Sequence, residues 1–208
     1  MSIFFQHQID DSTRLGVWKI DENEEFFKGN VPQHRDVTHP HKGLQHLAGR
    51  FLLQYLFPDF PYELILIADT RKPYLKDEEF HFSISHCGDY AAAIVSKDRR
   101  VGIDIEIPAE KILQIQHKFI SEVEKKIFLT LDSRLQTPDS RLPTLLWSAK
   151  ESVFKWYGIG GVDFREHIRL QKKTDGSDTL ECHFVKTQTD LTVHYREFEH
   201  LILAWTLS

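Results

Sequence analysis

Apolar and acidic residues alternate in the segment 101–107, VGIDIEI, at the midpoint of the chain. Because a β-strand points successive side chains to opposite faces, Asp104 and Glu106 are predicted to share one face and the three isoleucines the other. A rise of roughly 3.3 Å per residue puts the two carboxylates about 7 Å apart, where a neighbouring cation would relieve their repulsion. Carboxylates without His or Cys companions favour a hard ion such as Mg²⁺. A half-buried strand with a solvated acidic face is the alternative interpretation.

A second segment, WSAKESVFKWYG at 147–158, has the pattern of a helix that ends at Gly158, a residue type typical of helix C-termini. Glu151 and Lys155 are four residues apart, so they are predicted to share a face. They could form an exposed salt bridge worth roughly a few tenths of a kcal/mol. Alternatively, Glu151 is a third carboxylate for the ion, and Lys155 is an ammonium group for a phosphate.

The residues from Pro40 onward predict a helix with an apolar stripe on one side. Lys42, His46 and Arg50 form a basic row on the other side, which either binds phosphate or only solvates the helix. Histidines occupy positions 34, 39, 41 and 46, but their spacing matches no zinc-ligand pattern, so no zinc site is predicted.

Strands are predicted at 14–20, 63–67, 80–86 and 90–96, and a basic, proline-anchored loop at 71–75. In FHFSISH, the hydroxyl of Ser85 precedes the imidazole of His86 at the end of a strand. This pair can bind a phosphate or hold a nucleophile. A Ser/His hydrolase would need a sharp Gly-x-Ser-x-Gly turn, which the segment lacks.

The second half repeats this mixture of elements. Helices are predicted at 111–119 and, after a capping box of Ser121 and Glu124, from there to about Leu131. A loop is predicted at 132–143, and strands at 164–170, 179–185, 191–195 and 201–207. Helices and short antiparallel strands in both halves predict an α+β fold.

Composition excludes several classes of function. The net charge of -5 carries no basic surplus of the kind that nucleic-acid binding needs. Two cysteines are too few for a disulfide scaffold. No apolar run approaches the roughly 20 residues that cross a bilayer, and the N-terminal residues do not form a signal peptide. We expect a cytoplasmic protein with reduced thiols that binds neither nucleic acid nor membranes.

The segments VGIDIE and WSAKESVFK, in this order and at a similar separation, resemble the paired signature of the 4′-phosphopantetheinyl transferases. RKPYL at 71–75 and FSISH at 82–86 look like the coenzyme A segments of that family, and LAGR at 47–50 is similar to a further element. The chain length resembles the Sfp-type branch, which implies a pseudo-dimer of two similar halves, each a small antiparallel sheet packed with helices. The implied halves are 1–101 and 102–208, with the active site at their junction.

The resemblance implies an enzyme, a holo-[acyl-carrier-protein] synthase. It would transfer the 4′-phosphopantetheine arm of coenzyme A to a serine of an apo acyl or peptidyl carrier protein, giving holo-carrier and 3′,5′-ADP. Its cofactor would be Mg²⁺, and the two-halved chain would act as a monomer. Two alternatives remain open: a Mg²⁺-dependent phosphohydrolase with water as nucleophile, and a non-catalytic module that binds coenzyme A or the carrier.

The resemblance also assigns roles to individual residues. Asp104, Glu106 and Glu151 would hold Mg²⁺, and Lys155 would neutralise the phosphate or the departing 3′,5′-ADP. Glu151 is favoured as the base that deprotonates the carrier serine, with Glu106 as the alternative. The remaining residues would contact coenzyme A: Ser85 and His86 at its phosphates, Lys72 and Arg71 at the pyrophosphate or nucleotide, and Lys42 and Arg50 as further phosphate contacts.

Overall fold

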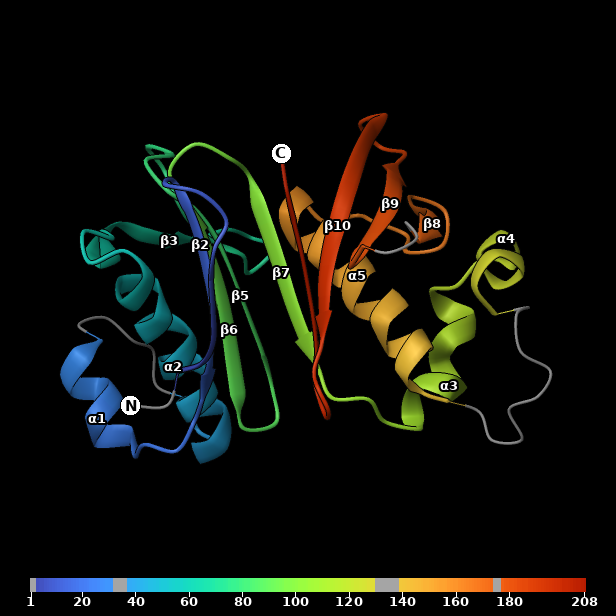
Figure 1. Ribbon diagram of the computed structural model, residues 1–208. Helices are drawn as coiled ribbons and strands as arrows, with labels where there is room; N and C mark the ends of the chain where they lie inside the picture. Colours follow the sequence, from blue (N-terminus) through green and yellow to red (C-terminus); the bar gives the residue numbers. More distant parts are fainter. Residues whose placement is uncertain (1–2, 32–36, 130–138, 174–176) are drawn as a thin grey trace.

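The computed structural model describes residues 3–31, 37–129, 139–173 and 177–208. Two antiparallel sheets face each other, and each carries a long helix on its outer face (Figure 1). The predicted α+β fold is confirmed. No helix in the part of the chain that the structure describes is both long and apolar enough to cross a membrane.

The N-terminal sheet has the strand order β1-β2-β6-β5. Its strands are β1 (Ile3–Gln8), β2 (Thr13–Lys19), β5 (His81–Cys87) and β6 (Tyr90–Ser96). Helices α1 (Glu24–Asn30) and α2 (Pro40–Leu56) pack on its outer face, where α2 buries the predicted apolar stripe. Strand β1 was not predicted, whereas the other three strands and α2 were.

A two-stranded arm projects from this half. It consists of β3 (Ile65–Ile67) and β4 (Pro73–Leu75), preceded by the 3-10 turn η1 (Tyr62–Leu64). The strand predicted at 63–67 therefore begins later than expected. The segment 71–75 is only partly the predicted loop, because its last three residues pair with β3.

The C-terminal sheet has the strand order β7-β11-β10-β9-β8. Its strands are β7 (Val101–Glu106), β8 (Ile168–Lys173), β9 (Thr179–Phe184), β10 (Thr189–Glu197) and β11 (Ile202–Leu207). Helix α5 (Arg141–Tyr157) packs on its outer face through Leu145, Ala149 and Val153. The strand predicted at 164–170 was placed too early, because residues 164–167 form a turn.

The chain between β7 and α5 is less regular than predicted. The helix expected at 111–119 divides into α3 (Lys111–Ile115) and the 3-10 turn η2 (Gln116–Lys118). The capping box opening α4 (Glu122–Glu124) is confirmed, but a short π-helix, η3 (Lys125–Leu129), follows at once. Most of the loop predicted at 132–143 lies outside the described residues, and α5 begins at Arg141.

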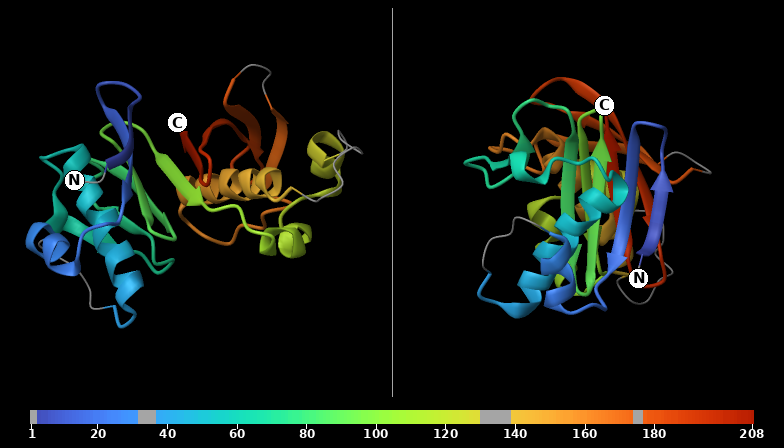
Figure 2. Two further views of the ribbon diagram at one scale, coloured as in Figure 1. Left: turned by 60° about the horizontal axis from the view of Figure 1, so that its bottom comes forward. Right: turned by 90° about the vertical axis from the view of Figure 1, so that its left-hand side faces the viewer.

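A third apolar layer joins the two halves. Leu15 and Ile94 of the N-terminal sheet pack with Ile103, Ile105 and Leu203 of the C-terminal sheet. The layers are therefore helix, sheet, sheet and helix, with α2 and α5 on opposite outer faces (Figure 2). The predicted alternation in β7 is confirmed for Ile103 and Ile105, which face this shared core.

Candidate active site

Strands β5 and β7, the edges of the two sheets, run side by side in the same direction and form what we call the seam. The hydroxyl of Ser83 accepts a hydrogen bond from the Ile103 backbone N–H at 3.2 Å. Two residues further on, the hydroxyl of Ser85 accepts one from the Ile105 N–H at 3.3 Å. Serine side chains thus replace the carbonyl partners that a continuous sheet would supply.

Gly102 lets α5 approach the seam closely. A Cβ atom at this position would lie 2.0 Å from the carbonyl oxygen of Ser152 and 2.5 Å from the backbone nitrogen of Trp156. Gly158 ends the helix with φ 73°, in the left-handed region that favours glycine, as predicted. The close approach brings the face of α5 that carries Glu151 and Lys155 onto Asp104.

Lys155 is bound across the seam. Its Nζ lies 2.6 Å from Oδ1 of Asp104 and donates to Oγ of Ser85 at 2.8 Å. Ser85 in turn donates to the same carboxylate oxygen at 2.8 Å. Asp104 is only 3% exposed, so the acidic face of β7 is not solvated at this residue. Lys155 therefore pairs with a buried carboxylate of another element rather than with its own helix surface.

Glu106 is held by two residues to which the sequence analysis assigned no function. The indole N–H of Trp147 donates to Oε1 of Glu106 at 3.1 Å, and the thiol of Cys87 donates to Oε2 at 3.4 Å. Burial, followed by the charge of Asp104, raises the pKa of Glu106. Trp147 precedes Glu151 by four residues, so their shared helix face was the signal that could have identified it.

Glu151 interacts electrostatically with both other carboxylates. Burial raises its pKa from 4.5 to about 7, and Asp104 and Glu106 act in the same direction. Lys155 opposes the shift. The fold therefore brings the strand pair and the helix carboxylate within reach of one another's charge, at the junction of the halves.

The three carboxylates Asp104, Glu106 and Glu151 are donors of the kind that Mg²⁺ prefers. In the described part of the chain, Oδ2 of Asp104 is buried without a hydrogen-bond partner. The pKa values of Glu106 and Glu151 are raised first by burial and then by neighbouring negative charge, and a hard cation would offset both effects. Within the same residues, no three or more His, Cys, Asp or Glu side chains are arranged so that they could hold a metal ion as they stand, so the three carboxylates would have to move closer together to share one.

The raised pKa of Glu151 predicts how stability depends on pH. The folded protein holds this proton more tightly than the unfolded chain, so stability is lost as pH rises through about 7. From roughly pH 5 to pH 8 in EDTA, we expect the protein to lose about 2 kcal/mol relative to Glu151→Gln, which cannot titrate there. Urea unfolding of both proteins measures the difference, and Mg²⁺ should restore more stability at the higher pH. Parallel pH profiles would contradict the assignment.

Basic groups flank the carboxylates at the end of β5. His86 is exposed, yet desolvation of its ring lowers its pKa, and the charges of Lys155 and Lys42 lower it further. Lys42 is thus close enough to act on His86, although it comes from α2. The start of α2 is docked there because His41 and Gln45 hydrogen-bond to the carbonyl oxygen of Gly88 at 3.0 and 2.8 Å.

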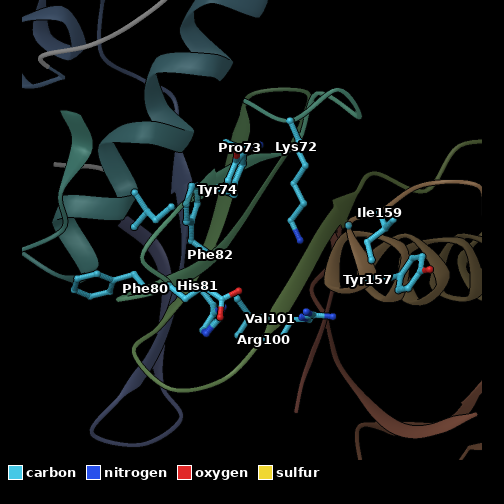
Figure 3. A pocket seen from close by; sticks show the side chains of 14 residues that line it. Lys72, Pro73, Tyr74, Phe80, His81, Phe82, Arg100, Val101, Tyr157 and Ile159 are labelled. Atoms are coloured by element: carbon cyan, nitrogen blue, oxygen red, sulfur yellow. The ribbon is translucent and has the colours of Figure 1, made fainter. Parts of the chain in front are cut away.

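Lys72 connects the arm to α5. Its Nζ donates to the backbone carbonyl of Lys155 at 2.5 Å. Burial, and then the charge of Arg100, lower the pKa of Lys72 to about 8. The side chain extends into a pocket of about 280 Å³ between the halves, with Arg100 beyond its tip and Ile159 to one side (Figure 3). An ammonium has three N–H donors, so this bond leaves others for an anion.

The last two predicted contacts come from the arm and from α2, and Arg71 lines a pocket together with Lys72 and Lys155. Arg71 is exposed in the turn between β3 and β4, with φ 65°. Arg50 is on α2, where its charge acts on Tyr62, whose pKa burial raises. Of the four histidines noted in the sequence, His34 lies outside the described residues.

These features define a class of protein: an α+β chain with two sheets, in which Lys155 pairs with Asp104 and the carboxylates of Glu106 and Glu151 lie close enough to interact electrostatically. The model of the 4′-phosphopantetheinyl transferase superfamily matches residues 100–206, just over half of the chain. The chain belongs to this superfamily, and the resemblance seen in its sequence is confirmed.

Curated relatives agree with this family. Enterobactin synthase component D of Salmonella austin is 37% identical over 116 residues, which cover 53% of this chain and 46% of that protein. The Escherichia coli O157:H7 protein of the same name is 31% identical over 130 residues, 60% of each chain. The 4′-phosphopantetheinyl transferase psf-1 of Bacillus pumilus is 30% identical over 140 residues, 64% of this chain and 58% of that protein. The chain spans about half the length of the relatives that it matches.

Proposed function

We propose that this chain is a phosphopantetheinyl transferase of the Sfp type. It moves the 4′-phosphopantetheine arm of coenzyme A to a serine of an acyl or peptidyl carrier protein and releases 3′,5′-ADP. The observation that carries the proposal is the mutual electrostatic interaction of Asp104, Glu106 and Glu151 beside Lys155, whose Nζ is 2.6 Å from Asp104. Family membership and the named relatives support the same reaction class.

Phosphoryl transfer depends mainly on positioning and on neutralising charge. Asp104, Glu106 and Glu151 would hold Mg²⁺, which supplies positive charge to the diphosphate of coenzyme A. Trp147 and Cys87 orient Glu106, and Ser85 orients Asp104. Lys155 adds a second positive charge, for the phosphate or the departing 3′,5′-ADP.

Glu151 is the proposed base. The pKa of about 7 applies to the metal-free site, and a bound Mg²⁺ would lower it, so that Glu151 is ionised and able to accept a proton near neutral pH. The carrier serine oxygen attacks the phosphorus that bears the pantetheine arm, and its proton passes to Glu151. The bond between that phosphorus and the 3′,5′-ADP oxygen breaks, so the arm ends on the serine.

Coenzyme A contacts are proposed for residues 1–101, and the metal and catalytic groups for residues 102–208. His86 and Lys42 support an anion subsite because the Lys42 charge lies close enough to act on His86, whose ring N–H can donate a hydrogen bond to a phosphate. Lys72 and Arg71 would meet the pyrophosphate or nucleotide, and Arg50 would add a further contact. The hydroxyl of Ser85 already has Asp104 and Lys155 as partners, which favours orientation of these groups over direct phosphate binding.

One reaction tests the function. The chain is incubated with Mg²⁺, coenzyme A and an apo-carrier, and the carrier is weighed by mass spectrometry. A gain of one phosphopantetheine arm is expected. Release of phosphate with an unchanged carrier would instead identify a phosphohydrolase, and neither product would leave a binding module. The same samples, run on a sizing column, test the proposed monomer.

His86→Ala is expected to raise the KM for coenzyme A about tenfold, because the lost partner of a charged phosphate is worth about 1.5 kcal/mol. The KM for dephospho-coenzyme A, which lacks the 3′-phosphate, should be nearly the same in the variant and in wild type. His183→Ala, on β9 of the other sheet, is the control and should leave both values unchanged. Equal losses with both substrates would argue against a 3′-phosphate contact at His86.

A further inference from the structure

Lys150, the residue before Glu151 on α5, is completely buried, with 0% of its surface exposed. Its Nζ lies 2.7 Å from Oε1 of Glu124 and 2.9 Å from Oε2. The same nitrogen donates to the carbonyl oxygens of Phe164 and Ile168, each at 2.8 Å. All three N–H donors of the ammonium are therefore used inside the protein.

The other member of the pair is equally well satisfied. Oε1 of Glu124 accepts a hydrogen bond from the Leu170 N–H at 2.9 Å, and Oε2 accepts one from the Ser121 N–H at 2.8 Å. The pair therefore ties α5 to the capping box of α4, to the turn before β8 and to β8 itself. The partners named here belong neither to β7 nor to the three carboxylates of the site.

Such an anchor fixes the rotation of a helix. Successive residues on an α-helix are about 100° apart, so the direction of Lys150 determines the direction of Glu151 and, one turn later, of Lys155. Among the described residues, the side-chain hydrogen bonds that join α5 to β7 run from Lys155 to Asp104 and from Trp147 to Glu106. Both use groups of the site itself, whose contacts must change when a cation and a diphosphate bind.

We propose that Lys150 and Glu124 are positioning residues, which hold α5 at the rotation that presents Glu151 and Lys155 to Asp104. This inference rests on the proposed function, since it concerns the same site. A buried ion pair is on balance only weakly stabilising, so stability alone is a poor explanation for one with this many partners. A role in orienting α5 explains why Lys150 and Glu124 bind only residues outside the seam, which stay in place when the site binds its ligands.

The test compares Glu124→Gln with the wild-type chain. Glutamine keeps the size of the side chain, but it removes the charge and one of the two acceptor oxygens. We expect the affinity for Mn²⁺, measured by electron paramagnetic resonance without coenzyme A or carrier, to fall about tenfold or more. In the transfer assay, kcat should fall by a similar factor, while the KM for coenzyme A changes less than about twofold.

Leu146→Ala is the matched control, because Leu146 is 1% exposed, lies on α5 and packs in the same core without charge. It should lower the melting temperature at least as much as Glu124→Gln, with both proteins assayed well below their melting temperatures. Mn²⁺ affinity should stay within about twofold of wild type in the control. Equal weakening in both variants, or none in Glu124→Gln, would overturn the positioning role.

Lys150→Met provides a second, more severe variant. It should show the same selective loss of Mn²⁺ affinity and kcat where it folds; if it does not fold, Glu124→Gln decides alone. Measurements on the wild-type chain distinguish a failure of the proposed function from a failure of the positioning role. Wild type that neither binds Mn²⁺ nor modifies the carrier would contradict the proposed function and the positioning role with it. Wild type that does both, together with an unimpaired Glu124→Gln, would contradict the positioning role only.

Discussion

Asp104→Asn should lower the rate of arm transfer by about 10³-fold, the scale seen when one preorganised electrostatic group is removed from an active site. The substitution keeps the shape of the side chain, but it removes the negative charge and replaces one of the two carboxylate oxygens, of which Oδ2 is buried without a hydrogen-bond partner, by an NH₂ group that cannot coordinate a cation. It also deprives Lys155 of its negative partner. The carrier-modification assay under saturating coenzyme A measures the loss.

The same variant should keep its fold. Loss of the Lys155 pair is destabilising, but removal of the Asp104 charge also relieves its repulsion of Glu151 and Glu106. These effects oppose each other, so the melting temperature should change by only a few degrees. Asp77→Asn, an exposed residue next to the arm, is the control and should behave as wild type. Near-normal transfer by Asp104→Asn would remove this carboxylate from the site.

Gly102→Ala should unfold at a melting temperature about 10 °C lower, from a loss of roughly 4 kcal/mol. The added Cβ would meet backbone atoms of Ser152 and Trp156, which cannot move aside as a side chain can. Helix α5 must therefore shift away from β7, and Glu151 and Lys155 shift with it. Transfer activity should be reduced even at temperatures where the variant remains folded.

Gly29→Ala is the matched control for this substitution. Gly29 lies inside α1, and a Cβ there would meet nothing within 4 Å. Alanine should stabilise that helix by up to about 1 kcal/mol, because glycine is the poorer helix former. Calorimetry of the two variants should therefore give shifts of opposite sign. If Gly102→Ala had the same melting temperature as wild type, α5 and β7 could move apart at this position without loss of stability, which would contradict the prediction.

Local signals were sufficient for the elements that carry the site. The alternation in 101–107, the capping box at Ser121 and the glycine after Tyr157 each depend on residues within one turn or one strand. The capping box and the glycine are confirmed, and the alternation is confirmed for Ile103 and Ile105, whereas Ile107 lies beyond β7 and is exposed. The helix predicted at 111–119 is longer than the observed α3. The spacing of apolar residues does not show where an α-helix gives way to a 3-10 turn, as it does here at Gln116.

Contacts between distant segments were beyond the sequence analysis. That Ser85 would join Asp104 and Lys155, or that Lys72 would reach a carbonyl of α5, depends on the register of β5 against β7. Lys150 gave no signal either, because a lysine is almost never fully buried and its partner Glu124 was assigned only to a capping box. The electrostatic grouping of the three carboxylates was predicted, whereas their supporting contacts were not.

The hydrogen bonds at Ser83 and Ser85 that join β5 to β7 have a consequence for how copies of this chain associate. Strand edges are templates for aggregation, and here β5 and β7 shield each other through hydroxyl groups and not through a full ladder. If the seam opens, both edges are uncovered at once, and the best match for each is the opposite edge of a second copy. Partial unfolding at high concentration should therefore produce reciprocally swapped dimers before it produces amorphous precipitate.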